Sequence, residues 1–237
     1  MKRTILVARK EILSYFISPM GYIYLVIFLS VTSWLFMRGF FLMNQADMRD
    51  FFTLLPWIFL LFIPAITMKL FAEERKSGTL EIALTMPVNE WEFVLGKFLA
   101  SFLFFTFSIF LTLIIPVSIS ILGNLDWGQV IGSYIGTLFL GAAYISIGMF
   151  ASSLTKNQVV AFILGAIITF FFFIIGERLV TISLPQGVAS VFQFLGLGYH
   201  FKSIARGVLD TRDLIYYLSF IAFFIFLTYY VIKEKRP

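Results

Sequence analysis

The side chains that could carry out chemistry are few in this sequence of 237 residues. It contains no cysteine, which excludes a thiol nucleophile, a disulfide framework and a thiolate metal site. Its single histidine, His200, has no second histidine or carboxylate at the spacing that a metal site needs. We therefore expect no catalytic residue and no metal site. We interpret His200 as a hydrogen-bonded structural side chain, with a catalytic or ligating role as the alternative.

The motifs for nucleotide chemistry are also absent from the sequence. The phosphate-binding pattern G-x-x-x-x-G-K-[ST] does not occur, and Gly196-Leu197-Gly198 lacks the rest of a dinucleotide fingerprint. Any use of ATP would therefore require a separate subunit that binds the ATP and Mg. We expect no cofactor bound directly to this chain.

The composition indicates a membrane protein. Hydrophobic residues make up 60% of the chain and charged residues only 13%, against about 25% charged in soluble domains. A helix needs about 20 apolar residues to cross a bilayer. We predict an all-α integral membrane protein, one domain over 1–237, with six transmembrane helices. Their approximate ranges are 19–41, 51–71, 91–122, 128–154, 158–175 and 214–232.

Helix-start signals precede several of these ranges. Ser18 followed by Pro19 is typical of a helix N-terminus. Capping-box spacing, in which a second polar side chain follows the cap by three residues, occurs three times. The three pairs are Asn89 with Glu92, Asp126 with Gln129, and Asp210 with Asp213.

The basic residues indicate the orientation. Twelve of the 18 Lys and Arg fall on the side that both termini share, which predicts cytoplasmic termini. They sit at the ends of apolar runs, so we expect contact with membrane lipids and not with nucleic acid. Residues 2–17 alternate basic and apolar side chains at helical spacing, which favours an amphipathic interfacial helix. A topogenic tail without helix is the alternative.

The last outer loop, residues 176–213, is too apolar for a solvated linker, yet Pro185, Gly187, Gly196 and Gly198 interrupt it. No run in it reaches spanning length, so we predict a re-entrant or interfacial helical hairpin before the last span.

Glu177 and Arg178 are the most prominent opposite charges beside this loop. Adjacent residues do not face each other on a helix, so each can pair elsewhere. We consider both residues candidates for an outer gate, with interfacial anchoring as the alternative.

Charges and helix breakers mark the loop between the second and third ranges. Gly78 should end the helix that extends from the second range, Thr79 can cap a new short helix, and Pro87 should stop that helix. A short helix fixed to two spans could bind in a groove of another protein and transmit movement of that protein to both spans.

This loop, AEERKSGTLEIALTMPVNEWEFVLGK from Ala72 to Lys97, resembles the cytoplasmic coupling region of type-2 ABC exporter permeases. The stretches PAITM, 64–68, and SSLTKNQVVAF, 152–162, are similar to the same family. The resemblance extends over essentially the whole chain and is nearest to the short bacterial branch with the gliding-motility-associated permeases.

The resemblance implies a six-span subunit of an exporter that pairs with itself or a similar permease and sits on two ABC ATPase subunits. It implies that a short coupling helix transmits closure of the ATPase dimer to the spans. The matching loop positions are Glu73, Glu74, Gly78, Thr79, Glu81 and Pro87. Arg9 and Glu11, in the interfacial helix, are expected to lie near the ATPase.

Other functions are open from the sequence alone. A membrane enzyme would need a polar constellation that the sequence does not display. An ATP-independent channel or carrier, or a membrane scaffold of a surface machine, is the alternative to a permease. Ionisable residues are scarce within the spans, which disfavours a proton-coupled transporter and favours an apolar path for a lipid-like cargo. Small residues four apart, such as Gly132 and Gly136, indicate close helix packing, within the chain or at a dimer seam.

Overall fold

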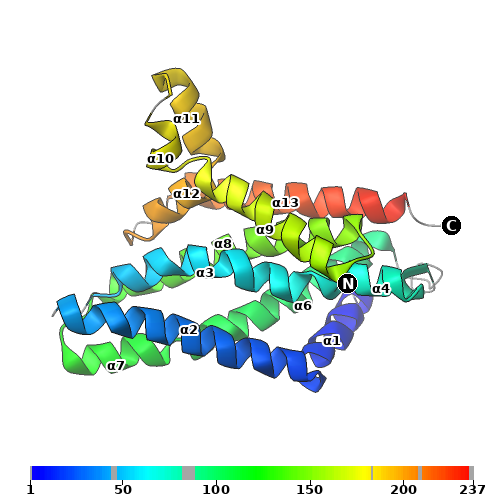
Figure 1. The fold of residues 1–237 in the computed structure, drawn as a ribbon, viewed down its shortest axis with the longest axis horizontal. Coiled ribbons are helices and arrows are strands. Elements are labelled where there is room, and N and C mark those ends of the chain that lie inside the picture. Colours follow the sequence, from blue (N-terminus) through cyan, green and yellow to red (C-terminus); the bar gives the residue numbers. More distant parts are fainter. Residues whose placement is uncertain (1, 44–46, 82–88, 183, 208–209, 235–237) are drawn as a thin grey trace.

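The computed structural model describes residues 2–43, 47–81, 89–182, 184–207 and 210–234, and within these ranges it contains helices and no strand (Figure 1). The all-helical class predicted from the sequence is confirmed. The helices with given bounds are α1 (Lys2–Ile17), α2 (Pro19–Met43), α3 (Arg49–Thr67), α4 (Lys69–Lys76), α6 (Glu90–Leu111), α7 (Ile114–Leu122), α8 (Trp127–Leu154), α9 (Gln158–Ile174), α10 (Arg178–Thr181), α11 (Gln186–Leu195), α12 (Leu197–Ile204) and α13 (Thr211–Lys233).

Five helical segments within the described ranges are long and apolar enough to cross a membrane. They are Pro19–Phe40, Arg49–Lys76, Glu90–Leu122, Trp127–Leu154 and Thr211–Lys233. The predicted fifth span corresponds to α9, which is apolar but has only 17 residues. A multi-pass membrane protein is therefore confirmed, while a count of six spans stays a prediction.

Helix α8 occupies the centre of the bundle, with 78% of its most apolar window buried, against 28% for α2. Its glycines allow neighbouring backbone to approach. A Cβ on Gly132 would lie 3.2 Å from the Cα of Gly207, and one on Gly136 would lie 2.7 Å from Ile204. The small-residue pattern therefore serves packing inside this chain.

The predicted third span, 91–122, corresponds to the segment Glu90–Leu122, but the helix within it is interrupted. Helix α6 ends at Leu111 and α7 begins at Ile114, so 91–122 is not one continuous helix. The cause lies in Pro116, which has no N–H to donate to the carbonyl of Thr112. That carbonyl instead accepts from the N–H of Ile115 at 2.9 Å and from the Tyr134 hydroxyl at 3.3 Å.

The helix starts match the sequence signals in part. The capping box of Asn89 and Glu92 is present at the start of α6. Asp126 and Asp210 do cap α8 and α13 with their carboxylates. Their expected reciprocal partners have other roles, however: the amide of Gln129 donates to Ala205, and Asp213 pairs with His200. These two capping boxes are therefore incomplete.

Both termini, α4 and the turn between α8 and α9 lie at one end of the bundle, and α10–α12 stand at the other (Figure 1). The predicted N-terminal helix is present as α1, which packs on α6. A Cβ on Gly96 would lie 2.7 Å from Val7, so only glycine allows this close approach. Ala8 and Tyr15 of α1 are buried, while its apolar Ile5 and Leu6 stay exposed, as an interfacial helix requires.

Candidate coupling site

The step from α3 to α4 is built around the hydroxyl of Ser152 on α8. In a continuous helix, the N–H groups of Phe71 and Ala72 would donate to carbonyls four residues earlier. Here both donate to Ser152 Oγ, at 3.0 and 3.1 Å, and the Ser152 hydroxyl donates to the Met68 carbonyl at 2.8 Å. This uses the full hydrogen-bonding capacity of the hydroxyl. Insertion of a side chain into the ladder breaks the helix and fastens α4 to α8.

A buried lysine joins the same region to two more helices. Lys97 lies on α6 and is 1% exposed. Its ammonium donates to the Leu70 carbonyl at 2.7 Å, to Glu74 Oε1 at 2.9 Å and to Glu11 Oε2 at 3.4 Å. All three ammonium protons therefore have acceptors, which a buried charge requires. We call Lys97, Glu11, Glu74, Leu70 and Ser152 the Lys97 junction.

Aromatic and backbone contacts surround the junction. The Lys97 ammonium lies 5.2 and 5.3 Å from the ring centres of Phe93 and Phe71, within cation–π range. Tyr15 of α1 is buried, which raises the pKa of its phenol, so the hydroxyl stays neutral and donates to the carbonyl of Ile66. Arg75 of α4 donates to the Ser153 carbonyl at 2.9 Å. Helices α1, α4, α6 and the end of α8 are thus held together at one site.

Beyond the junction, α4 is followed by residues 77–81, which we call the tip and which are exposed except for Leu80. Gly78 has φ of 72°, a conformation that favours glycine, and it terminates the helix as predicted. The hydroxyl of Thr79 donates to the Glu74 carbonyl at 3.4 Å, and most of the helix that Thr79 would cap lies outside the described residues, so its capping role stays a prediction. The carbonyls freed at the end of α4 need donors, and Thr79 supplies one. Residues 79–81 are helical, with Leu80 buried and Glu81 exposed.

The structure separates the expected ATPase-contact residues into two groups. Glu74 and Glu11, from different helices, meet at Lys97. The others in the described part of the chain are exposed on the surface, and Pro87 lies outside the described residues. The exposed ones are Arg9, Glu73, Gly78, Thr79 and Glu81.

Sequence reasoning missed the central residue of the junction. From the sequence, Lys97 is one of the twelve basic residues on the side of the termini, and nothing more is predicted for it. Its signal was available, because a single lysine in the apolar run FVLGKFLASF marks an ionisable residue within a span. Ser152 begins the family-like stretch 152–162, but no local pattern reveals that its hydroxyl reaches α4.

At the other end of the bundle, the two candidate gate residues do not meet. Glu177 pairs with Lys202, while Arg178 is exposed. His200 is buried and bonded on both ring nitrogens, to Asp213 Oδ1 at 2.6 Å and to the Phe194 carbonyl at 2.9 Å. This confirms the structural interpretation of His200. We call residues 176–205 the hairpin end.

The comparisons with known proteins identify the class. The sequence profile of the family described as "ABC-2 family transporter protein" matches residues 36–235, and the chain therefore belongs to this family. No curated protein matches the chain. Members are membrane permease subunits, generally non-catalytic, that normally work with an ABC ATPase subunit. The gliding-motility branch stays a prediction.

Proposed function

We propose that this chain is the permease subunit of an ATP-driven exporter and that a separate ABC ATPase moves its spans through the end of α4. The Lys97 junction supports the proposal most directly. One buried ammonium ties α4 to α1 and α6, and the tip beyond α4 is exposed to a partner. A force on the tip would therefore reach several helices at once. The chain itself would contribute no catalytic group.

The proposal also assigns an orientation. The termini, the tip and the turn after α8 share one end of the bundle (Figure 1), and most basic residues belong to the segments at that end. We place this end in the cytoplasm of a bacterium, below its inner membrane, where the ATPase has ATP and Mg. A second permease, identical or similar, would complete the transporter.

Co-purification tests the proposal. The tagged chain is co-expressed with the ABC ATPases of its host and isolated in a mild detergent, and the recovered ATPase is quantified. Glu81→Lys reverses an exposed carboxylate on the tip, and Asp50→Lys reverses an exposed carboxylate at the opposite end of the same helical segment. We expect Glu81→Lys to lower ATPase recovery at least tenfold and Asp50→Lys to leave it unchanged.

Two results would redirect the assignment. If no ATPase accompanies the intact chain, an ATP-independent channel or a membrane scaffold becomes the better hypothesis. If an ATPase is recovered equally with both variants, the tip is not its contact. Membrane insertion of both variants is checked first, so that loss of binding is not loss of the protein.

A further inference from the structure

A cavity of about 550 Å³ lies between α2 and α3, beside the end of α1, with α6 and α9 adjoining. This is within the range of roughly 300–1,000 Å³ that is typical of small-molecule sites. One wall includes Ile23, Ile27 and Leu61, whose side chains are 52%, 48% and 59% exposed. In a membrane-spanning bundle, exposed apolar side chains at this place face lipid, so the cavity is open to acyl chains.

Most of the polar side chains that line the cavity gather at one end. Ser14, Ser18, Lys69, Glu73 and Gln158 line it there. The N-terminal ends of α2 and α9 lie at the same end, because Ser18 precedes α2 and Gln158 is the first residue of α9. The Lys69 ammonium and the positive end of the α9 dipole favour an anionic group at this place, whereas the positive end of α2 is offset by the C-terminal end of α1 directly before it. The cavity is therefore amphipathic along its length.

Lys69 and Glu73 occupy this polar end without neutralising each other. They are one turn apart on α4, yet no ion pair within 4.0 Å joins them in the described part of the chain. The ammonium of Lys69 lies 4.7 Å from the ring centre of Tyr15. Lys69 is nearer to the span and Glu73 is farther out. A lipid headgroup whose negative charge lies near the acyl chains and whose positive charge lies farther out would place its negative charge at Lys69 and its positive charge at Glu73.

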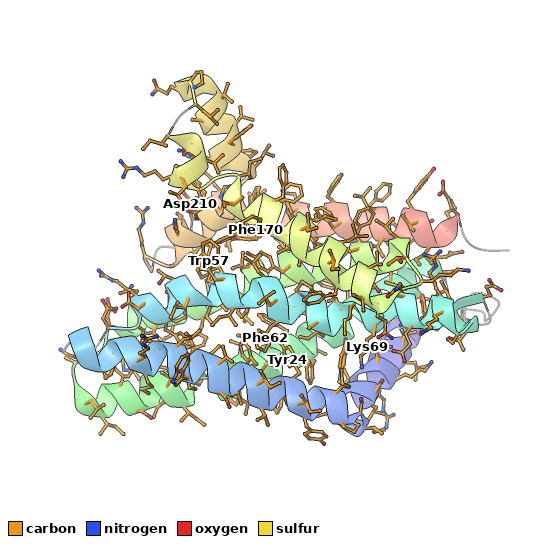
Figure 2. All side chains as sticks on the ribbon, viewed as in Figure 1. Tyr24, Trp57, Phe62, Lys69, Phe170 and Asp210 are labelled. Atoms are coloured by element: carbon orange, nitrogen blue, oxygen red, sulfur yellow. The ribbon has the colours of Figure 1, made fainter. Side chains whose placement is uncertain are left out.

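Tyr24 provides one more polar group, deeper in the cavity. Figure 2 shows Tyr24 and Phe62 between α2 and α3, with Lys69 nearer to the end of the bundle that carries α4. The hydroxyl of Tyr24 is buried and has no hydrogen-bond partner. An unpartnered buried hydroxyl is unfavourable unless a ligand supplies an acceptor. The ester carbonyl of a glycerolipid is such an acceptor, and it lies between headgroup and acyl chain.

We propose that this cavity holds an aminophospholipid of the phosphatidylethanolamine type. One acyl chain lies along Ile27, Leu61 and Phe62, the phosphate contacts Lys69, and the primary ammonium contacts Glu73. The site stands independently of the proposed coupling to an ATPase, because it is built within this single chain.

Native mass spectrometry of the full chain, purified alone, tests the site. The protein is offered equal amounts of phosphatidylethanolamine, phosphatidylcholine and phosphatidylglycerol with identical acyl chains. We expect phosphatidylethanolamine to be retained about fivefold better than either competitor, because only its headgroup carries an ammonium with N–H donors for Glu73. Lys69→Gln should weaken binding of all three about fivefold. Glu73→Gln should abolish the preference among them.

Two further variants make the result specific to the cavity. Ala65→Trp fills the apolar part and should remove lipid retention, while Lys76→Gln, on the same helix but outside the cavity, should change nothing. Equal retention of the three lipids by the intact chain would overturn the proposal. Retention by Ala65→Trp equal to that of the intact chain would also overturn it, since the lipid would then bind elsewhere.

Discussion

The Lys97 junction and the hairpin end both contain a buried polar contact, but they connect the chain in different ways. The contacts of the junction join residues 23 to 86 positions apart in sequence, and most join residues about 80 apart. Those around His200, Lys202 and the neighbouring tyrosines of α13 join residues only 6 to 25 positions apart. The junction therefore unites α1, α4, α6 and α8 into one body. The contacts around His200 are local, and the hairpin end bonds to α8 at its last residue, where the Ala205 carbonyl accepts from Gln129 and Ser133.

Burial shows the same contrast. The α4 segment buries Leu70, Phe71 and Ala72 beside the junction. In α11, by contrast, no residue is buried, and Phe194 there is 63% exposed. The hairpin end is attached through α12, which packs on α8 and α9. A change at the junction should therefore affect the whole bundle, and a change at the hairpin end should stay local.

The largest effect is expected from Lys97→Met. Removing the ammonium leaves Glu74 and Glu11 without their buried counter-charge, which typically costs about 3–5 kcal/mol. Equilibrium unfolding in mixed detergent micelles should show this loss. The triple variant with Glu11→Gln and Glu74→Gln should recover much of it, because no unpaired charge remains.

Lys76→Met is the matched control, since Lys76 is exposed on α4. Equal unfolding free energies for Lys97→Met and Lys76→Met would contradict the central place of Lys97 in the structure.

A smaller effect is expected from Ser152→Ala. The N–H groups of Phe71 and Ala72 lose their acceptor, and unsatisfied buried groups cost about 1–3 kcal/mol. The same unfolding measurement applies, and hydrogen exchange should increase in α4. Ser118→Ala removes an exposed hydroxyl that bonds only within its own helix, and should have almost no effect. An α4 as protected in Ser152→Ala as in Ser118→Ala would show that the hydroxyl does not fasten it.

Gly196→Ala tests the hairpin end and should have the most local effect. Its Cβ would lie 2.4 Å from the Cα of Gly176, so two backbone segments must separate. We expect faster hydrogen exchange in residues 176–205 with unchanged exchange in α8. Gly187→Ala, where nothing lies within 4 Å, is the control. If α8 exchanges faster in Gly196→Ala, the hairpin end is coupled to the bundle and the contrast fails.

Much of the fold was predictable because apolar run length and helix-start residues are local signals. The start of α6 at Asn89, the end of α4 at Gly78 and the helix α1 follow from them. The break after α6 is caused by Pro116, which is visible in the sequence. We did not predict the break, because the apolar run 91–122 is long enough to suggest one uninterrupted helix. The partners of Asp213 and Gln129 could not be inferred, since spacing alone cannot tell a capping role from a tertiary contact.

The candidate site was predictable only in part, for a physical reason. Glu74 and Glu11 could be proposed from the resemblance, but their meeting point depends on how α1 packs on α6. Lys97 lies 86 residues from Glu11, and no local pattern records that contact. The cavity at Lys69 and Tyr24 likewise arises from segments distant in sequence.

A measurement of the distance between α1 and α4 tests most directly whether the two helices move as one body when an ATPase acts on the chain. The chain has no cysteine, so spin labels attach only to the cysteines that are introduced. We choose Lys10→Cys on α1 and Lys76→Cys on α4, because both positions are exposed. Electron–electron resonance is recorded on the complex with the ATPase, without nucleotide and with ATP trapped. We predict one narrow distance distribution that does not change between the two states. A distribution that broadens or shifts with ATP would contradict the account, because α4 would then move independently of α1.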